Sequence, residues 1–385
     1  MILQQYIPMT IDQLPTPFYI IYEDRIRRNL DLIVDVAARA DVEIIMAFKA
    51  NALWRTFDIA REYGFGCTAS SINELRLGRE YLTDNVHAYS PAYTDDTIDE
   101  YAHNCTHITF NSLSQWERYG ARLRDTGVSA GLRVNPHCSV IDTDIYNPAL
   151  PGSRFGVSAS EIGNSLPEGI EGLHFHALCE STSYDLAKVL EAFEHQFGHL
   201  LPQAKWVNMG GGHLMTRQGY DTGHLIELLK SFRRRYPHLR VILEPGSAFM
   251  WRTGDLISSV VDVVSHDDVN TAIMDVSFAC HMPDTLEMPY RPTVSESVSE
   301  QPGRTIAYRL GGNSCLSGDF VGDWHFTKPL YPGMRLTFED MNHYTNVKTT
   351  MFNGIHHPDI VLCDRDGQCH YLRRYTYEDY KSRMS

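Results

Sequence analysis

A single lysine, Lys49, ends an apolar segment of the chain and could supply a nucleophile. Residues 44–48 are all apolar, and the chain has no lysine before position 49. When a lysine lies at the end of a buried strand, loss of hydration lowers its pKa, and the neutral amine can form a Schiff base with a carbonyl group. The alternative is a lysine whose ammonium group reaches back to water. The polar residues that end the other apolar segments must decide between these interpretations.

Three consecutive glycines at 210–212 follow the strand-like segment 206–209. Because glycine has no side chain, the backbone N–H groups of such a loop are open to a ligand, and loops of this kind bind phosphate. A flexible turn is the alternative. A position after a late strand favours phosphate, since barrel proteins bind phosphate at the loops after strands seven and eight.

A carboxylate, Glu244, emerges from the apolar segment 241–243 and is followed by Pro245. A buried acid needs a partner, and an arginine salt bridge would be one. A protonated pyridine nitrogen would be another, because the ion pair keeps the ring cationic and makes it an electron sink. Together with Lys49 and the glycines, this second interpretation predicts pyridoxal 5'-phosphate (PLP) as the cofactor.

Two histidines, His174 and His176, lie two residues apart in another apolar segment and should face the same way. This spacing would suit a metal site, with Cys179 nearby, and a metal-dependent hydrolase is one alternative. No further set of ligands with suitable spacing follows, so we expect no metal. The other interpretation places His176 flat against an aromatic cofactor, with His174 packed lower.

Eight short apolar segments must position these side chains, and helical patterns separate several of them. An alternation of strands and helices predicts parallel βαβ units, and eight strands predict a (β/α)8 TIM-type barrel, which we place at 23–254. An open doubly wound sheet is the alternative. The predicted strands are 44–48, 65–69, 86–89, 107–110, 130–134, 172–177, 206–209 and 241–244. The predicted helices include 23–40, 72–81, 113–123, 185–197 and 225–235.

The character of the chain changes near residue 255, where β-like segments alternate with loops containing proline and glycine. This pattern predicts a C-terminal antiparallel β domain at 255–385, joined by a strand from the N-terminal segment 1–22. Its small-residue loop 311–319 carries Cys315. That thiol could serve as an acid, or it could be a buried bystander.

Composition limits the possible partners and compartment. The 385-residue chain has a net charge of -14, which argues against nucleic acid and would suit a small cationic molecule. The eight cysteines form no CxxC pair, so reduced thiols and a cytoplasmic location are expected. No apolar run is long enough to predict a membrane span or an export signal.

The motifs together resemble the fold type III PLP-dependent decarboxylases, the alanine racemase-like group. The resemblance runs from residue 16 to residue 354, and within the group it is greatest to the carboxynorspermidine decarboxylases. It is carried by the segments 46–51, 174–180, 281–284, 287–292 and 311–316. The positions that match the family's cofactor-binding residues are Lys49, Glu74, His176, Gly210, Gly211, Gly212, Glu244 and Tyr344.

The resemblance also implies an activity and an assembly. It implies that Lys49 and Cys315 are catalytic, that Cys315 comes from the partner subunit of a homodimer, and that Ser247, Asp284 and Cys315 contact the substrate. The implied reaction is decarboxylation of carboxynorspermidine or carboxyspermidine, which belongs to polyamine biosynthesis. The chain departs from several relatives at Ser247, where they have arginine, and at Leu316, where they have an acidic residue. These departures argue against ornithine and diaminopimelate as substrates.

Three alternatives to this function remain. Another decarboxylase of the same fold, acting on diaminopimelate or another basic amino acid, is the nearest. A racemase is less favoured, because its fold relatives place arginine rather than Glu244 at the pyridine nitrogen. A non-catalytic PLP-binding protein would have no second domain to supply Cys315 and Tyr344.

Overall fold

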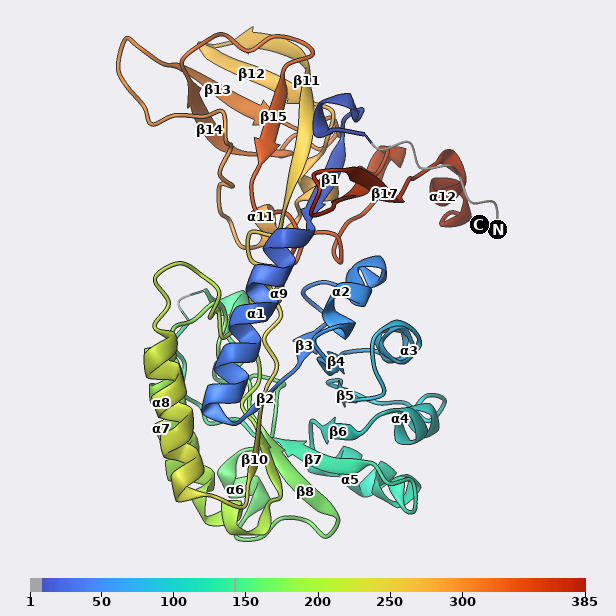
Figure 1. Ribbon diagram of the computed structural model, residues 1–385, viewed down its shortest axis with the longest axis vertical. Coiled ribbons are helices and arrows are strands. Elements are labelled where there is room, and N and C mark those ends of the chain that lie inside the picture. The colour runs from blue at the N-terminus through green and yellow to red at the C-terminus, as the bar shows by residue number, and fades with distance from the viewer. Residues whose placement is uncertain (1–8, 142) are drawn as a thin grey trace. The chain divides into compact units, whose positions relative to one another are not determined.

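The computed structural model describes residues 9–141 and 143–385, and the chain divides into two compact units (Figure 1). One unit is Arg28–Phe249, and the other combines Met1–Arg27 with Met250–Ser385. The first eight residues of the expected N-terminal segment, 1–22, lie outside the described residues. The candidate strand-end residues therefore fall in the first of these units.

The unit Arg28–Phe249 contains a parallel sheet that nearly closes into a barrel. Its first strand is split at Ile45: β2 (Glu43–Ile44) pairs with the last strand, and β3 (Met46–Ala47) pairs with β4. The other strands are β4 (Cys67–Ala69), β5 (Val86–Tyr89), β6 (His107–Phe110), β7 (Ser129–Arg133), β8 (Ile170–His174), β9 (Trp206–Asn208) and β10 (Arg240–Leu243). The predicted TIM-type barrel is confirmed, and the open sheet is excluded.

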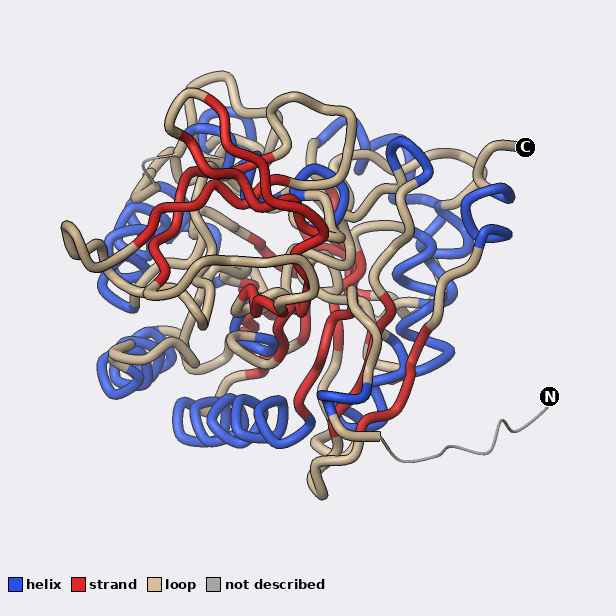
Figure 2. Tube along the Cα trace, turned by 90° about the horizontal axis from the view of Figure 1, so that it is seen from above, coloured by secondary structure: helices blue, strands red, loops and turns tan. Residues whose placement is uncertain are grey.

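Helices lie on the outer side of these strands (Figure 2). Helix α1 (Glu23–Ala40) and helix α3 (Ile72–Tyr81) have the predicted bounds. The Ser71 side chain accepts a hydrogen bond from the Glu74 backbone N–H and so caps α3. The remaining helices of the barrel are α2 (Phe57–Arg61), α4 (Ile98–Asn104), α5 (Leu113–Tyr119), α6 (Ala159–Ile162), α7 (Ser183–Phe197) and α8 (Thr222–Arg235).

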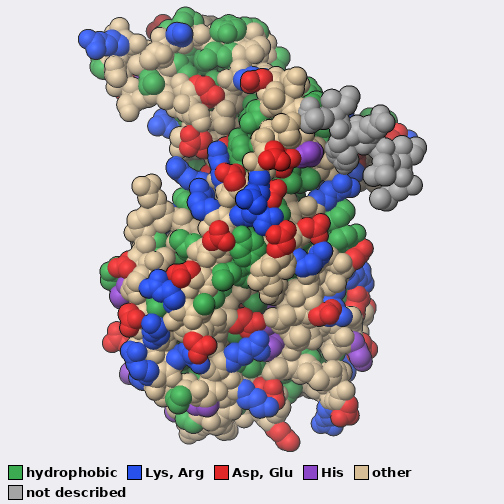
Figure 3. All heavy atoms as spheres, viewed as in Figure 1, with side chains coloured by type: hydrophobic (Ala, Val, Ile, Leu, Met, Phe, Trp, Pro, Cys, Tyr) green, Lys and Arg blue, Asp and Glu red, His purple; other side chains and the backbone are tan. Residues whose placement is uncertain are grey.

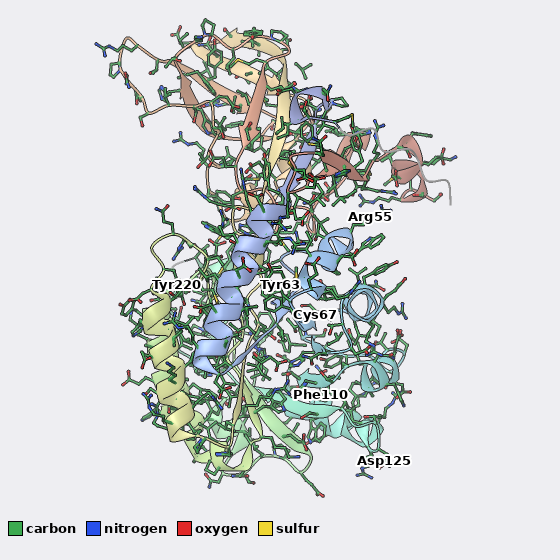
Figure 4. All side chains as sticks on the ribbon, viewed as in Figure 1. Arg55, Tyr63, Cys67, Phe110, Asp125 and Tyr220 are labelled. Carbon is green, nitrogen blue, oxygen red and sulfur yellow. The ribbon has the colours of Figure 1, made fainter. Side chains whose placement is uncertain are left out.

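A large buried side chain, Trp206, packs against two glycines of the neighbouring strands. The ring of Trp206 on β9 occupies the space that side chains on the neighbouring strands would need, since a Cβ atom built on Gly172 would lie 2.0 Å from it and one on Gly131 2.2 Å from it. Both glycines are therefore required by packing. Phe110, labelled in Figure 4, is wholly buried at the end of β6.

The second unit contains an eight-stranded sheet with the order β14-β13-β12-β11-β1-β16-β17, in which β15 also pairs with β11. The strand β1 (Phe18–Tyr22) lies in this sheet, as predicted. The sheet is mixed rather than antiparallel, because β1 runs parallel to β16 and β12 runs parallel to β13. The strands are β11 (Gly254–His266), β12 (Val269–Met274), β13 (Ile306–Gly311), β14 (Phe320–Phe326), β15 (Arg335–Phe338), β16 (Asp359–Cys363) and β17 (Cys369–Arg373).

Short helices complete the chain. They are α9 (Ser247–Met250), α10 (Phe278–His281), α11 (Asp284–Glu287) and α12 (Tyr377–Ser382). No helix in the described part of the chain has the length and hydropathy needed to cross a bilayer. On the face of the barrel unit visible in Figure 3, acidic and basic side chains are interspersed, which agrees with the many surface ion pairs between them.

Candidate active site

Four of the predicted chemical groups follow the carboxyl ends of barrel strands. Lys49 follows β3, His176 follows β8, the glycine triplet at 210–212 follows β9, and Glu244 follows β10. Parallel strands of a barrel present these ends at one edge, where side chains from different strands can meet. The structure brings Lys49, His176, the glycines and Glu244 together, as predicted.

Lys49 lies in a turn whose neighbours are firmly packed. The ring of Phe48 is wholly buried and stacks on Phe57, with 4.8 Å between ring centroids. Gly246 approaches the same turn so closely that a Cβ atom built on it would lie 2.5 Å from Cβ of Ala50. The Nζ atom of Lys49 lies 3.5 Å from Nε2 of His176. Burial lowers the pKa of Lys49, and Arg133 acts in the same direction against the opposing effect of Glu244.

The hydrogen bonds of His176 determine which of its nitrogens carries the proton. Its Nδ1 accepts a 2.9 Å hydrogen bond from the backbone N–H of Gly211, so the proton of the neutral ring is on Nε2. Burial, reinforced by Lys49 and Arg133, holds the pKa of His176 well below its usual value. If Lys49 were an ammonium group, its N–H donors would face the Nε2–H donor of His176, which is an unfavourable contact. The geometry therefore favours a neutral Lys49 amine, which is the nucleophilic form.

Glu244 lies between a side chain from β8 and a side chain from β9. Its Oε1 lies 3.2 Å from Nε2 of His174, and its Oε2 accepts a 3.0 Å hydrogen bond from Nδ2 of Asn208. Burial alone would raise the pKa of this carboxyl group, but His174, Lys49 and Asn208 outweigh it and lower the pKa to about 2. Glu244 is thus an ionised carboxylate at neutral pH, and the alternative, an arginine salt bridge, is not among its contacts in the described residues.

The glycine triplet is required by close approach of the backbone. A Cβ atom on Gly210 would lie 2.5 Å from the carbonyl oxygen of Phe175, and one on Gly212 would lie 2.4 Å from that of Leu178. Gly210 and Gly212 also have positive φ angles, of 72° and 87°. At Gly211 the same test gives 2.6 Å to the carbonyl oxygen of Glu244. The loop is therefore a tightly packed one, which agrees poorly with a flexible turn.

Arg133 is a member of this region that sequence reasoning missed. It ends β7, is only 3% exposed, and donates a 3.2 Å hydrogen bond to the backbone carbonyl of His176. Its guanidinium group lies over the rings of Tyr89 and Phe155, 4.7 and 4.5 Å from their centroids. The available signal was a charged residue inside the otherwise apolar predicted strand 130–134. Arg133 supplies a buried positive charge near the site.

The two other predicted residues of the barrel unit have local structural contacts. Glu74 accepts a 2.6 Å hydrogen bond from the backbone N–H of Ser70, which places its carboxylate at the start of α3. Burial raises the pKa of Glu74, while Ser70 and Lys49 act to lower it. Ser247 is buried and begins the short helix α9, three residues after Glu244.

The remaining predicted residues lie in the second unit, where a buried carboxylate organises the loop that carries Cys315. Asp319 is 3% exposed and accepts hydrogen bonds from the Ser314 hydroxyl, at 2.6 Å, and from the Ala279 backbone, at 2.9 Å. A Cβ atom on Gly312 would lie 2.1 Å from the Asp319 carboxylate. Cys315 itself is exposed, and its N–H donates to the side-chain oxygen of Asn353 at 2.8 Å. The loop thus presents the thiol outward, and the thiol is not a buried bystander.

Asp284 and Tyr344 occupy separate positions in the same unit. Asp284 begins α11, and its Oδ1 lies 2.8 Å from Nζ of Lys348, which also pairs with Glu287. Asp284 is therefore already in contact with an alkylammonium group. Tyr344 lies in a loop and has a positive φ angle of 50°. Among residues 9–141 and 143–385, no three His, Cys, Asp or Glu side chains are grouped as a metal site would require.

Three comparisons with known proteins agree with this arrangement. The family described as "Pyridoxal-dependent decarboxylase, C-terminal sheet domain" matches residues 33–342. The carboxyaminopropylagmatine decarboxylase of Synechocystis sp. is 47% identical to the chain, over 97% of the chain and 96% of that protein. The carboxynorspermidine/carboxyspermidine decarboxylase of Campylobacter jejuni is 40% identical, over 97% of the chain and the whole of that protein.

A solved structure is similar throughout. The crystal structure of carboxynorspermidine decarboxylase from Campylobacter jejuni, complexed with norspermidine, has a TM-score of 0.89 and 39% sequence identity. The match covers 96% of the chain and all of that structure. The similarity therefore extends over both units and not only the barrel.

Proposed function

Because the chain belongs to the family of pyridoxal-dependent decarboxylases, we propose that it decarboxylates carboxynorspermidine, and carboxyspermidine with it, to norspermidine and spermidine. The observation that carries the proposal is the meeting of a neutral lysine amine, an uncharged imidazole and an ionised carboxylate at one end of the barrel. Its reaction would belong to polyamine biosynthesis.

The residues present fit PLP. Lys49 offers a buried amine for the aldehyde carbon, and Glu244 offers an ionised carboxylate for the ring nitrogen. The imidazole of His176 would lie against the ring, because its Nδ1 is fixed by Gly211. The backbone N–H groups of the loop 210–212 and the hydroxyl of Tyr344 would bind the phosphate, and Glu74 would lie near the cofactor.

When bound, PLP supplies a cationic ring that accepts the electron pair left behind as CO2 departs. Glu244 keeps the proton on the ring nitrogen, because its carboxylate remains ionised at neutral pH. Glu244 itself is buried, which would strengthen this ion pair. Lys49 would hold the cofactor, and the Cys315 thiol or the Lys49 amine would be the group that gives a proton to Cα.

The second unit would complete the site from a partner subunit. Cys315 is exposed on its own unit, on a loop ordered by Asp319, and so is available to another chain. We propose a homodimer in which Cys315 of one protomer serves the barrel of the other, with Asp284 and Ser247 on the substrate. We place the enzyme in the cytoplasm, since none of its eight cysteines is in a disulfide.

A second candidate substrate is carboxyaminopropylagmatine, which the 47% identity with the Synechocystis decarboxylase favours. It shares the carboxyl-bearing head of the other two substrates but ends in a guanidinium group rather than an ammonium group. A carboxylate such as Asp284 can accept hydrogen bonds from either cation, and a guanidinium group would add a bidentate contact.

Measurement of CO2 release discriminates between these substrates. The purified protein, supplied with PLP, is tested on carboxynorspermidine, carboxyspermidine, carboxyaminopropylagmatine, meso-diaminopimelate, ornithine and arginine. We expect the highest kcat/KM with carboxynorspermidine or carboxyspermidine, and a ratio between the two within about 200-fold, since one methylene changes binding by only ~1–3 kcal/mol. Preference for carboxyaminopropylagmatine would establish the second candidate. Preference for any of the last three substrates would contradict both.

A further inference from the structure

The histidine that faces Glu244 has no role in the proposed chemistry, although it is among the most deeply buried polar residues of the barrel. His174 ends β8 and is 1% exposed. Its ring lies 5.3 Å from that of Tyr89, and its Nε2 lies 3.2 Å from Oε1 of Glu244. Packing alone would be satisfied by an apolar side chain at this position, so the contact with Glu244 needs a reason.

The protonation state of His174 follows from its two ring nitrogens. Nε2 faces a carboxylate oxygen and must therefore carry hydrogen. Among the described residues, Nε2 has only its 3.2 Å approach to Oε1 of Glu244, which falls outside hydrogen-bond geometry, and Nδ1 has no hydrogen-bond partner. A second proton there would be a buried donor without an acceptor, which is costly. Burial also lowers the pKa of His174, so the ring is neutral and its Nε2 faces Oε1 of Glu244.

The other carboxylate oxygen of Glu244, Oε2, also has a defined partner. Asn208 accepts a 2.8 Å hydrogen bond from the backbone N–H of Gly210 at Oδ1, which fixes its amide so that Nδ2 faces Glu244. That Nδ2 donates to Oε2 at 3.0 Å. Each oxygen of the carboxylate thus faces one neutral nitrogen group, hydrogen-bonded at Oε2 and in close approach at Oε1, and we expect the two contacts to restrict rotation of the carboxylate plane. Neither donor neutralises the charge.

We propose that His174 is a positioning residue for decarboxylation: with Asn208, it holds Glu244 as an ionised and oriented carboxylate, the form that can pair with the protonated ring nitrogen of PLP. This inference rests on the proposed function, because it assumes that Glu244 meets that nitrogen. Glu244 then keeps a negative charge with which the ring cation can pair. A lysine or arginine in place of His174 would compete for it.

The test compares three variants that differ in what they present to Glu244. His174→Gln keeps a neutral donor at nearly the same place, His174→Leu removes the donor, and His174→Asn stays polar but is too short to reach. His107→Gln is the matched control, because His107 is a buried histidine of the same barrel that stacks on His87 and makes no contact with Glu244. Thermal unfolding of each apoprotein identifies variants that do not fold.

The main measurement is the PLP dissociation constant, obtained by titrating each apoprotein with PLP and following the visible absorbance. His174→Leu and His174→Asn should bind PLP about 10- to 100-fold more weakly, the loss expected for one hydrogen bond to a charged group. His174→Gln and His107→Gln should remain within a few-fold of the wild type. The value of kcat should follow the same order.

The outcomes separate the inference from the proposed function. If the wild type binds PLP and releases CO2 but the glutamine and leucine variants behave alike, whether strong or weak, His174 is not a positioning residue. If the leucine variant does not fold, the glutamine and asparagine variants give the same comparison. If the wild type itself neither binds PLP nor releases CO2, the proposed function is wrong, whatever the variants show.

Discussion

Replacement of Gly211 by alanine tests whether the glycine loop is a rigid cradle or a flexible turn. The added Cβ atom would lie 2.6 Å from the carbonyl oxygen of Glu244, and such contacts are not tolerated below about 3.0 Å. Loop and strand must therefore separate by about 0.4 Å. The N–H of Gly211 also donates to Nδ1 of His176, so the separation displaces both a proposed ring contact and the backbone of Glu244.

The expected cost follows from this overlap. Overpacking of a well-packed site costs about 1–3 kcal/mol, which lowers Tm by roughly 2–12 °C in a unit of this size. PLP affinity should fall by tenfold or more, because Lys49 and His176 no longer meet in the same geometry. Differential scanning calorimetry of the apoprotein and spectrophotometric titration with PLP measure the two effects.

Gly198 provides a matched control. It lies just beyond α7 with an ordinary φ of -56°, and a Cβ atom on it would come no closer than 3.8 Å to another atom. Gly198→Ala should therefore leave Tm and PLP affinity unchanged or slightly raised. Equal behaviour of Gly211→Ala and Gly198→Ala would refute the reasoning and would support a flexible turn at 210–212.

Three further predictions concern acid stability, the far end of the substrate and the thiol. Burial lowers the pKa of His107 and of His213 from 6.5 to about 4. Between these pH values the two histidines bind protons in the unfolded chain but not in the folded barrel. Each histidine should therefore lower the free energy of unfolding by about 3 kcal/mol as the pH falls from 6.5 to 4. In urea unfolding, His107→Gln should lose less of this free energy over the same pH range than the wild type. Asp284→Asn should raise KM about tenfold with little change in kcat, whereas Lys348→Met should not raise it; an unchanged KM in Asp284→Asn would exclude Asp284 from the substrate site. Cys315→Ala should lower kcat by 100-fold or more, and mixing it with an inactive Lys49 variant should restore part of the turnover if the thiol comes from a partner subunit; full activity of Cys315→Ala alone would remove it from the mechanism.

Much of the barrel and of its site could be predicted because both depend on the order of elements along the chain. Alternating strands and helices require parallel pairing, and parallel strands bring their carboxyl ends to one edge. Lys49, His176 and Glu244 could therefore be expected to meet although nearly 200 residues separate the first from the last. Their types then indicated which cofactor they would suit.

Contacts that depend on the tilt of the strands could not be predicted. His174 meets Glu244 across an intervening strand, and Arg133 is buried only because the rings of Tyr89 and Phe155 cover its guanidinium group. The prediction of an antiparallel second sheet was wrong for a related reason. Strand β1 runs parallel to β16, which comes from the other end of the chain, and local sequence patterns carry no information on the direction of such a distant partner.

The most direct test of the proposed function is the attachment of PLP to one lysine. The wild type, Lys49→Ala and the control Lys205→Ala are supplied with PLP, reduced with borohydride, digested and mapped by mass spectrometry. Lys205 is an exposed lysine that pairs with Glu171 on the barrel surface. We predict a visible absorption band and a reduced PLP label on Lys49 in the wild type and the control, and neither in Lys49→Ala. A label on another lysine, or a band that persists in Lys49→Ala, would contradict the account.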